Sequence, residues 1–311
     1  MAADNSRYNL TLMQRCCVSL LYGLCRGVAI MPRWVRYYVL EEIIYFIMHH
    51  LMRYRRKVVM ENLRNSFPER SEKELKQIAS RFSRNLAEQM INTLSLTGLS
   101  SKRRLKLLTF PEAERYASEI AGRNCVSLAG HYGAWEYISI VGLHDVGHIA
   151  VGVYHSLESS VFDELFKRIR MGENVALVPR NEVMRYFIRN REGNPMNIGL
   201  IADQNQYRVK DPHWITFLNQ DTIFADGAEQ LARRFALPVY YLWLKRRRRG
   251  EYELHLELIY DGNEEVAEHE ITERYARCLE QTIRECPELW LWSHRRWKQK
   301  RKYERWQNLA S

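Results

Sequence analysis

The sequence predicts an α/β fold in which a mostly parallel central sheet is flanked by helices. From residue 105 onward, short apolar runs alternate with amphipathic stretches, a pattern typical of strands and helices that build a parallel sheet. Before that point the chain shows only helical patterns. We therefore expect N-terminal membrane-associating helices in residues 1–54. A larger domain should follow in residues 55–311, with a helical lead-in over 55–100 and an α/β core over 105–300.

The N-terminal region predicts two apolar helices. Residues 10–31 are apolar but carry Arg15 and Arg26, and Pro32 ends the stretch. A membrane-spanning helix needs about 20 mainly apolar residues and tolerates central charges poorly. The stretch is compatible with a helix lying in the membrane interface, with a tilted span, and with a buried helix of a soluble protein. A second helix over 34–53 is rich in aromatic residues and runs into a basic segment, as bilayer surfaces favour.

The helical lead-in is predicted from caps and periodicity. A helix over 57–66 should stop before Phe67-Pro68. Ser71 and Glu74 form a capping box that opens a long helix through Leu94. One apolar stripe marks its inner face, formed by Leu75, Ile78, Ala79, Phe82, Leu86 and Met90.

The core alternates between strands and helices. The expected strands are 125–129, 148–154, 175–178, 197–202, 238–244 and 252–258. The expected helices are 136–143, 159–170, 182–190, 227–235 and 272–284. We expect the last two strands to form an antiparallel hairpin at the edge of the sheet.

The stretch 124–136 combines a buried strand, a turn and the start of a helix. Gly130 and Gly133 flank His131 in the turn, and Glu136 follows five residues after the histidine. Residues five apart on a regular helix point about 140° from each other, so the two side chains can meet only if His131 lies on the bend. A carboxylate held against a histidine stabilises the imidazolium that a general base forms. The alternative is a helix N-terminus complemented by Glu136, with an incidental histidine.

Other polar residues also follow apolar strands. His131, Tyr154, Arg180 and Asp203 each come at the carboxyl end of an expected strand. Open α/β sheets bind ligands at that edge, so these residues are expected to gather in one site. The alternatives are that Asp203 caps a turn or helix, and that Arg180 pairs on the surface with Glu182.

Composition indicates acidic partners. The 311 residues carry a formal net charge of +10, which favours nucleic acid, anionic lipid or an acidic carrier protein. Residues 245–249 place five basic side chains at a predicted turn, either solvated or attracted diffusely to anionic lipid. Residues 290–298 mix tryptophans with cations, which suits a lipid headgroup layer, phosphate recognition or nucleic-acid stacking, unless the tryptophans are core residues.

No cofactor is expected from the sequence. The six cysteines have neither metal-ligand spacing nor a disulfide framework, which suits small buried side chains in a reducing compartment. The nucleotide-binding, metalloprotease and dinucleotide motifs are absent from the sequence, so no metal and no nucleotide are expected.

Four stretches, in this order, resemble the bacterial lipid A secondary acyltransferases, the lauroyl/myristoyl transferase family. They are residues 55–63 with Phe67-Pro68-Glu69, His131 to Glu136 as an H-x-x-x-x-D/E motif, Asp203-Gln204, and residues 290–298. Together they span about residues 50 to 300. Residues 217–220 depart from the Phe-Phe-Gly-like turn that the family often has, which leaves the local shape of the pocket open.

The resemblance implies an acyltransferase domain of the glycerolipid acyltransferase type. The donor would be an acyl carrier protein thioester, and the acceptor a hydroxyl of a Kdo-bearing lipid A precursor at the cytoplasmic face of the bacterial inner membrane, with no nucleic acid involved. His131 would be the general base and Glu136 its partner. The expected substrate-binding residues are Arg170, Arg180, Asp203, Gln204, Arg295 and Arg296. The four arginines are included because the planar guanidinium group suits bidentate binding of phosphates.

Two other functions are left open by the sequence. The acceptor could be a different lipid, such as a glycosylated phospholipid, a lysophospholipid or an aminolipid. The chain could also be a non-catalytic basic protein that binds membrane or nucleic acid. A paired His131 and Glu136 disfavours the latter, because binding needs charge but no held imidazole.

Overall fold

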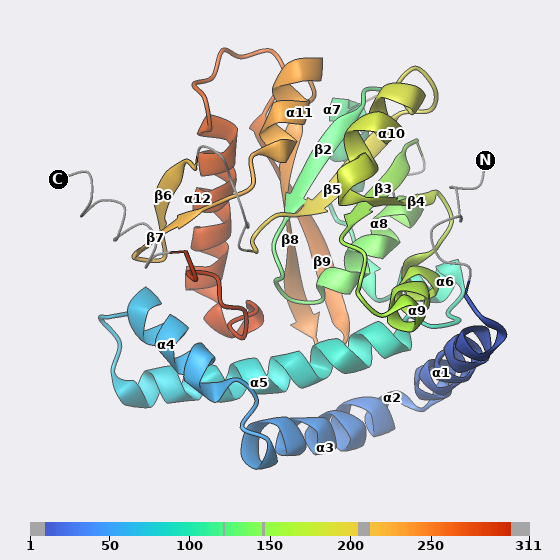
Figure 1. Ribbon diagram of the computed structural model, residues 1–311, viewed down its shortest axis with the longest axis vertical. Coiled ribbons are helices and arrows are strands. Elements are labelled where there is room, and N and C mark those ends of the chain that lie inside the picture. Colours follow the sequence, from blue (N-terminus) through green and yellow to red (C-terminus); the bar gives the residue numbers. More distant parts are fainter. Residues whose placement is uncertain (1–9, 121, 145–146, 205–211, 300–311) are drawn as a thin grey trace.

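A seven-stranded sheet forms the centre of the computed structural model, which describes residues 10–120, 122–144, 147–204 and 212–299 (Figure 1). The strand order is β1-β9-β8-β2-β5-β3-β4, and every neighbouring pair is parallel except β8 and β9. Helices α11 and α12 pack with one face of β2, and α7, α8 and α9 pack with the other. The expected α/β class, with a mostly parallel sheet flanked by helices, is confirmed.

The strands follow the predicted pattern closely. Their bounds are β1 Leu108–Thr109, β2 Cys125–Ala129, β3 Ile149–Tyr154, β4 Val175–Pro179, β5 Met196–Ile201, β8 Val239–Arg248 and β9 Glu251–Tyr260. The placement of the last hairpin at the sheet edge was wrong. Strand β8 pairs with β2, and the two-residue β1 covers the outer side of β9. A strand as short as β1 leaves no period-2 pattern to detect.

A separate antiparallel hairpin joins β6 (Trp214–Phe217) to β7 (Gln220–Ile223). Its two turn residues, Leu218 and Asn219, both have positive φ, at 50° and 61°. Two-residue hairpin turns of this hand fit the twist of the strands but favour Asn and Gly, so a leucine there is unusual. The buried Leu218 is held by a 2.8 Å hydrogen bond from its N–H to the Glu280 carboxylate. This turn is the stretch that departs from the acyltransferase pattern.

The remaining core elements are helical. They are α7 Ala113–Ile120, the 3₁₀ segment η3 Trp135–Ile140, α8 Val141–His144, α9 Ser160–Arg170, η4 Arg180–Glu182, α10 Val183–Asn190, α11 Gly227–Phe235, α12 Glu270–Glu285 and η5 Pro287–Leu289. The helix expected over 136–143 thus begins as a 3₁₀ segment. This difference changes the direction of Glu136, as described below.

Helices α1 to α3 form an outer layer beneath α5 (Figure 1). The bounds of the helical elements that precede the sheet are α1 Leu12–Ile30, α2 Arg33–Val35, η1 Arg36–Leu40, α3 Glu41–Phe46, η2 Ile47–Leu51, α4 Arg56–Ser66, α5 Glu72–Ser95 and α6 Ser101–Arg104. The capping box of Ser71 and Glu74 is confirmed at the start of α5. Within the described ranges no single helix is long and apolar enough to cross a membrane. Helix α1 and the segment Arg33–Leu51 pass that test only as a pair, bent by 110° at the break between them.

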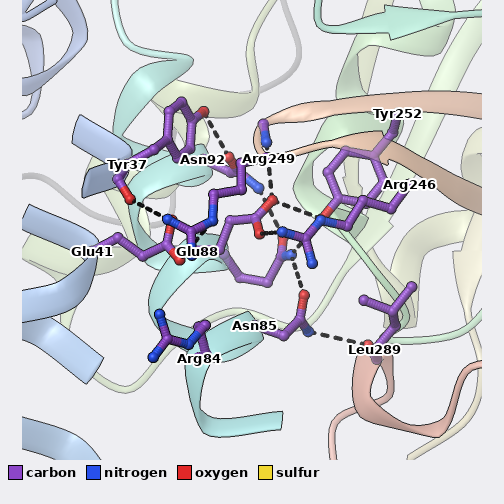
Figure 2. Close-up of polar contacts among 12 residues, drawn as sticks. Tyr37, Glu41, Arg84, Asn85, Glu88, Asn92, Arg246, Arg249, Tyr252 and Leu289 are labelled. Carbon is purple, nitrogen blue, oxygen red and sulfur yellow. Dashed lines mark hydrogen bonds and ion pairs between the residues drawn. The ribbon is translucent and has the colours of Figure 1, made fainter. Parts of the chain in front are cut away.

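Buried charges tie this outer layer to the sheet (Figure 2). Glu88 of α5 accepts hydrogen bonds from the Gly250 N–H and the Tyr252 hydroxyl, at 2.9 and 3.1 Å, and pairs with Arg246 at 2.6 Å. Arg249 donates to the Tyr37 carbonyl oxygen at 2.7 Å. The segment 245–249, which we expected to be a turn, is therefore mostly strand, and Arg246 and Arg249 anchor it to the helices.

Candidate active site

His131 lies just beyond the end of β2, in a turn where a side chain at Gly130 would force Leu279 of α12 to move. A Cβ atom there would approach Leu279 Cδ1 to 2.7 Å, and Gly133 has a positive φ of 57°. The turn is held from the other side by the segment after η5. The Gly133 N–H donates to the Leu289 carbonyl oxygen at 3.0 Å, and the Leu291 N–H donates to the His131 carbonyl oxygen at 3.1 Å. His131 is thereby fixed on the bend, as the sequence required.

The carboxylate that contacts His131 belongs to Asp203, directly after β5. Its Oδ1 lies 2.6 Å from His131 Nδ1, and its Oδ2 accepts the His131 backbone N–H at 2.8 Å. Trp290 donates its indole N–H to the same Oδ2 at 2.8 Å. Asp203 is only 2% exposed. Asp203 was expected at this edge of the sheet, but not as the partner of the histidine.

These contacts determine the charge of Asp203 and the tautomer of His131. Burial alone would raise the pKa of Asp203, but the charge of His131 and the hydrogen bonds from His131 and Trp290 outweigh it, so the pKa lies below its ordinary value. An ionised carboxylate only accepts hydrogen bonds, so Nδ1 carries a proton, and in the neutral form of the ring Nε2 is the nitrogen with the lone pair. Gln204 Nε2 lies 3.2 Å from His131 Nε2 and can donate to it. The free basic nitrogen thus faces away from Asp203.

Glu136 pairs with a different residue from the one we expected. Its two oxygens accept hydrogen bonds from Arg170 of α9, from Nε at 2.8 Å and from Nη2 at 2.7 Å. The expected contact between Glu136 and His131 was therefore wrong. The 3₁₀ segment η3 directs Glu136 toward α9, whereas the strand ends bring Asp203 to the histidine from 72 positions away in the sequence.

A cavity of about 760 Å³ begins at His131 and extends along the sheet. Adjacent side chains of four parallel strands form one wall, and η3, α8 and α9 contribute the other. Small and apolar residues line most of it, including Ala129, Ala150, Gly152, Val175, Leu177, Gly199 and Ile201. The polar groups His131, Glu136, Arg170, Arg180 and Gln204 also line it. The site therefore joins a histidine–carboxylate pair to a long apolar space.

The two C-terminal arginines lie apart from this cavity. Arg296 is 1% exposed and donates to Thr222 Oγ1 at 2.6 Å and to the Ile223 carbonyl oxygen at 2.7 Å. Its guanidinium also lies over the Phe224 ring, 4.3 Å from the centroid. This position fixes the β6–β7 hairpin and buries the guanidinium within the protein, so Arg296 does not face the cavity as we expected of a substrate-binding residue. Arg295 is exposed and does not line the cavity.

Three functional positions escaped the sequence analysis. Trp290 holds Asp203, and His294 lines the cavity. Burial lowers the pKa of His294 to about 4, although Asp203 opposes the shift, so the ring is neutral at neutral pH. Asn62 donates to the carbonyl oxygens of Trp292 and His294, at 2.9 Å each. The stretches 55–63 and 290–298 therefore resemble the acyltransferases for a structural reason, because the first holds the second against the catalytic turn.

No cluster of three or more His, Cys, Asp or Glu side chains in the described ranges is arranged to hold a metal ion. All six cysteines are free: Cys16 and Cys17 are exposed, Cys25 and Cys125 are buried, and Cys278 and Cys286 are partly buried. The exposed pair on α1 differs from the expectation that the cysteines are mostly buried.

The chain matches a known protein family over most of its length. A family described as bacterial lipid A biosynthesis acyltransferase matches residues 5–299, which is nearly the whole chain. A search of individual curated proteins found no match.

Proposed function

Because the chain belongs to the bacterial lipid A biosynthesis acyltransferase family, we propose that it moves a fatty acyl chain from an acyl carrier protein thioester to a hydroxyl of a Kdo-bearing lipid A precursor. The observation that carries the proposal is the His131–Asp203 pair at one end of a 760 Å³ apolar cavity. Such a site supplies a base for a hydroxyl and a space for a hydrocarbon chain.

The proposed reaction needs no covalent enzyme intermediate. His131 Nε2 removes the proton from the acceptor hydroxyl while the hydroxyl oxygen attacks the thioester carbonyl carbon. Asp203 stabilises the imidazolium and keeps its own charge. When the tetrahedral intermediate collapses, the carbon–sulfur bond breaks and the imidazolium returns the proton to the departing thiolate. General-base help contributes about 10²–10⁴-fold, so the developing oxyanion must also be stabilised.

We propose Gln204 and Arg170 as the groups that act on the reacting oxygens. The Gln204 amide nitrogen lies 3.2 Å from His131 Nε2. An acceptor hydroxyl that binds to Nε2 would displace the Gln204 amide group, which could then donate to the neighbouring thioester oxygen. Arg170 keeps part of its fork for the cavity, because Glu136 occupies only Nε and Nη2. Glu136 would then position Arg170 in this mechanism and would not act on the histidine.

Recognition of the acceptor is assigned to the rim of the cavity. Arg170 and Arg180 both line it, and a guanidinium suits the phosphates and acidic sugars of the proposed acceptor. Arg295 lies exposed on the segment that carries His294, and we propose that it adds diffuse attraction only. Arg296 has no substrate role in this proposal, since its guanidinium is buried and bonds Thr222 and the Ile223 carbonyl oxygen.

The membrane contact is assigned to the outer helices, at the cytoplasmic face of the inner membrane. Large apolar side chains on α1 and on the segment Arg33–Leu51 are exposed, among them Leu12, Leu20, Leu24, Ile30, Trp34, Tyr38, Phe46 and Leu51. A soluble monomer rarely exposes so many together, and a bilayer interface would cover them. The bent arrangement of the two helices favours contact with one leaflet.

The test is transfer by the purified full chain in lipid-containing buffer. Acyl carrier thioester and a Kdo-bearing lipid A precursor should give free carrier thiol together with a lipid heavier by one acyl group, read by mass spectrometry. His131→Ala should abolish both signals. His155→Ala is a matched control, because His155 is an exposed histidine at the same cavity and has no carboxylate partner among the described residues. Transfer only to a glycosylated phospholipid, lysophospholipid or aminolipid would refute the acceptor, and full activity of His131→Ala would refute the base.

A further inference from the structure

The far end of the cavity is polar, although its walls are apolar. Strand register places Ser127 of β2 beside Gly199 of β5, and Asn197 beside Cys125 and Ala150. Ser127 precedes His131 by four residues. Asn197 lies level with Cys125, which precedes His131 by six residues. At 3.3 Å per residue these are depths of about 13 and 20 Å along the strand. Both residues line the cavity.

Both side chains present a polar atom that is not satisfied by the protein. Ser127 Oγ and Asn197 Oδ1 are buried, and neither has a hydrogen-bond partner in the part of the chain that the structure describes. The Asn197 amide nitrogen donates to the Tyr116 hydroxyl at 2.8 Å. Turning the amide over would only exchange which of its two polar atoms is unpaired. Unpaired buried polar groups are rare in proteins, so this pair calls for a ligand or a functional reason.

The pair changes the energetics of a hydrocarbon chain at this depth. Along the upper cavity, each added methylene leaves water for an apolar wall and gains affinity. A methylene that reaches Ser127 or Asn197 displaces the solvent that can pair with them, and the loss from an unpaired buried group exceeds the gain from one methylene. The benefit of chain length therefore reverses at these residues.

We propose that Ser127 and Asn197 form a polar floor that limits the length of the acyl chain, through the cost of leaving their polar atoms unpaired and not through the bulk of their side chains. The inference rests on the proposed function, because it takes the cavity as the acyl-chain site. It makes Ser127 a residue that determines specificity for the donor.

Ser127→Cys separates polarity from size, because cysteine is slightly larger than serine but behaves as a small apolar side chain. The assay is kcat/KM with decanoyl, dodecanoyl, tetradecanoyl and hexadecanoyl carrier thioesters and one fixed acceptor. The measured quantity is a ratio of two kcat/KM values: that of the shortest chain longer than the preferred one, divided by that of the preferred chain. A polar floor predicts that Ser127→Cys and Ser127→Ala each raise this ratio about tenfold. A floor set by bulk predicts that Ser127→Cys lowers it, and that result would overturn the proposal, as would an unchanged ratio in both variants.

Two controls keep this result separate from the proposed function. Ser139→Ala makes the same chemical change in the same cavity, but the Ser139 hydroxyl already donates to the Glu136 carbonyl oxygen at 2.8 Å, so the ratio should not change. Gly199→Val should shift preference to shorter chains, because a Cβ there has room and points along the proposed chain path. If no thioester supports transfer, the proposed function fails. If transfer occurs but Gly199→Val changes nothing, the chain lies elsewhere and the polar floor is refuted.

Discussion

Asp203→Asn should reduce turnover far more than Glu136→Gln. Asparagine keeps the shape of the side chain but loses the charge that stabilises the imidazolium, and its amide group can donate to Nδ1 and reverse the tautomer of His131. In serine proteases, the equivalent change lowers kcat by about 10⁴. We expect a loss of about 10³–10⁴ here, because Asp203 is almost fully buried and bonds both Nδ1 and the backbone N–H of His131.

The loss for Glu136→Gln can be estimated from its pair with Arg170. Removing the charge weakens two charge-assisted hydrogen bonds, of 2.7 and 2.8 Å, in a partly exposed site. A hydrogen bond to a charged group contributes about 1.5–3 kcal/mol, which corresponds to a loss of about 10- to 150-fold in transfer. The predicted order of the two variants is therefore fixed by the structure.

Steady-state kinetics with matched donor and acceptor would compare the two variants, with circular dichroism and thermal unfolding as checks on folding. The role of Asp203 as the partner of His131 is refuted if folded Asp203→Asn retains more than about a tenth of wild-type kcat. It is also refuted if Glu136→Gln is the more damaging change, since that order would restore Glu136 as the partner of the histidine.

Three further predictions concern stability and membrane binding. Burial, reinforced by the charge of Glu88, raises the pKa of Glu41 from 4.5 to about 7. Ionisation of Glu41 therefore destabilises the folded state, and this loss of stability grows between about pH 4.5 and 7 and is complete above pH 7. Glu41→Gln should therefore unfold less readily than wild type at pH 8, by no more than about 3 kcal/mol, with the difference shrinking toward pH 5 in urea titrations; a constant difference would contradict the assignment. Arg296→Met should lower the free energy of unfolding by about 2–4 kcal/mol, because Thr222 and the Ile223 carbonyl lose their donor. The KM for the acceptor should not change. A stable variant with a raised KM would instead indicate that Arg296 binds the substrate. Leu20→Glu with Leu24→Glu should weaken vesicle flotation at high salt as well as low salt, since both exposed leucines would enter the interface; flotation equal to wild type would place the membrane contact elsewhere.

The sheet was predictable wherever a strand was long enough to carry a pattern. The six expected strands lie close to those observed, because fully buried runs such as Cys125–Ala129 differ clearly from the helices between them. Strand β1 has two residues, and the β6–β7 turn uses Leu218 and Asn219 without the usual glycine. Both were missed because the local sequence carries no strand or turn signal strong enough to detect.

The site was predictable in position but not in pairing. His131, Asp203 and Gln204 meet because parallel strands end at one edge, and that rule needs only the order of the strands. The partner of the histidine depends on whether residue 136 begins an α-helix or a 3₁₀ segment, and local spacing does not decide this. The use of Trp290 to hold Asp203 depends on a contact between segments 87 positions apart, which periodicity cannot indicate.

The polar face of α5 links the outer helices to the catalytic turn. Glu88 holds the tip of the β8–β9 hairpin, and Arg249 of that tip contacts Tyr37 of the outer layer. One turn earlier, Asn85 donates to the Leu289 carbonyl oxygen at 3.4 Å, the same oxygen that accepts the Gly133 N–H beside His131. A division at residue 54 would therefore cut through a buried hydrogen-bonded cluster. A chain that starts near Arg55 loses Tyr37 and Glu41 together with the apolar face, so its loss of activity would report on the packing of α5 as well as on membrane binding. Point changes on the exposed side of α1, which leave these bonds in place, separate the two causes.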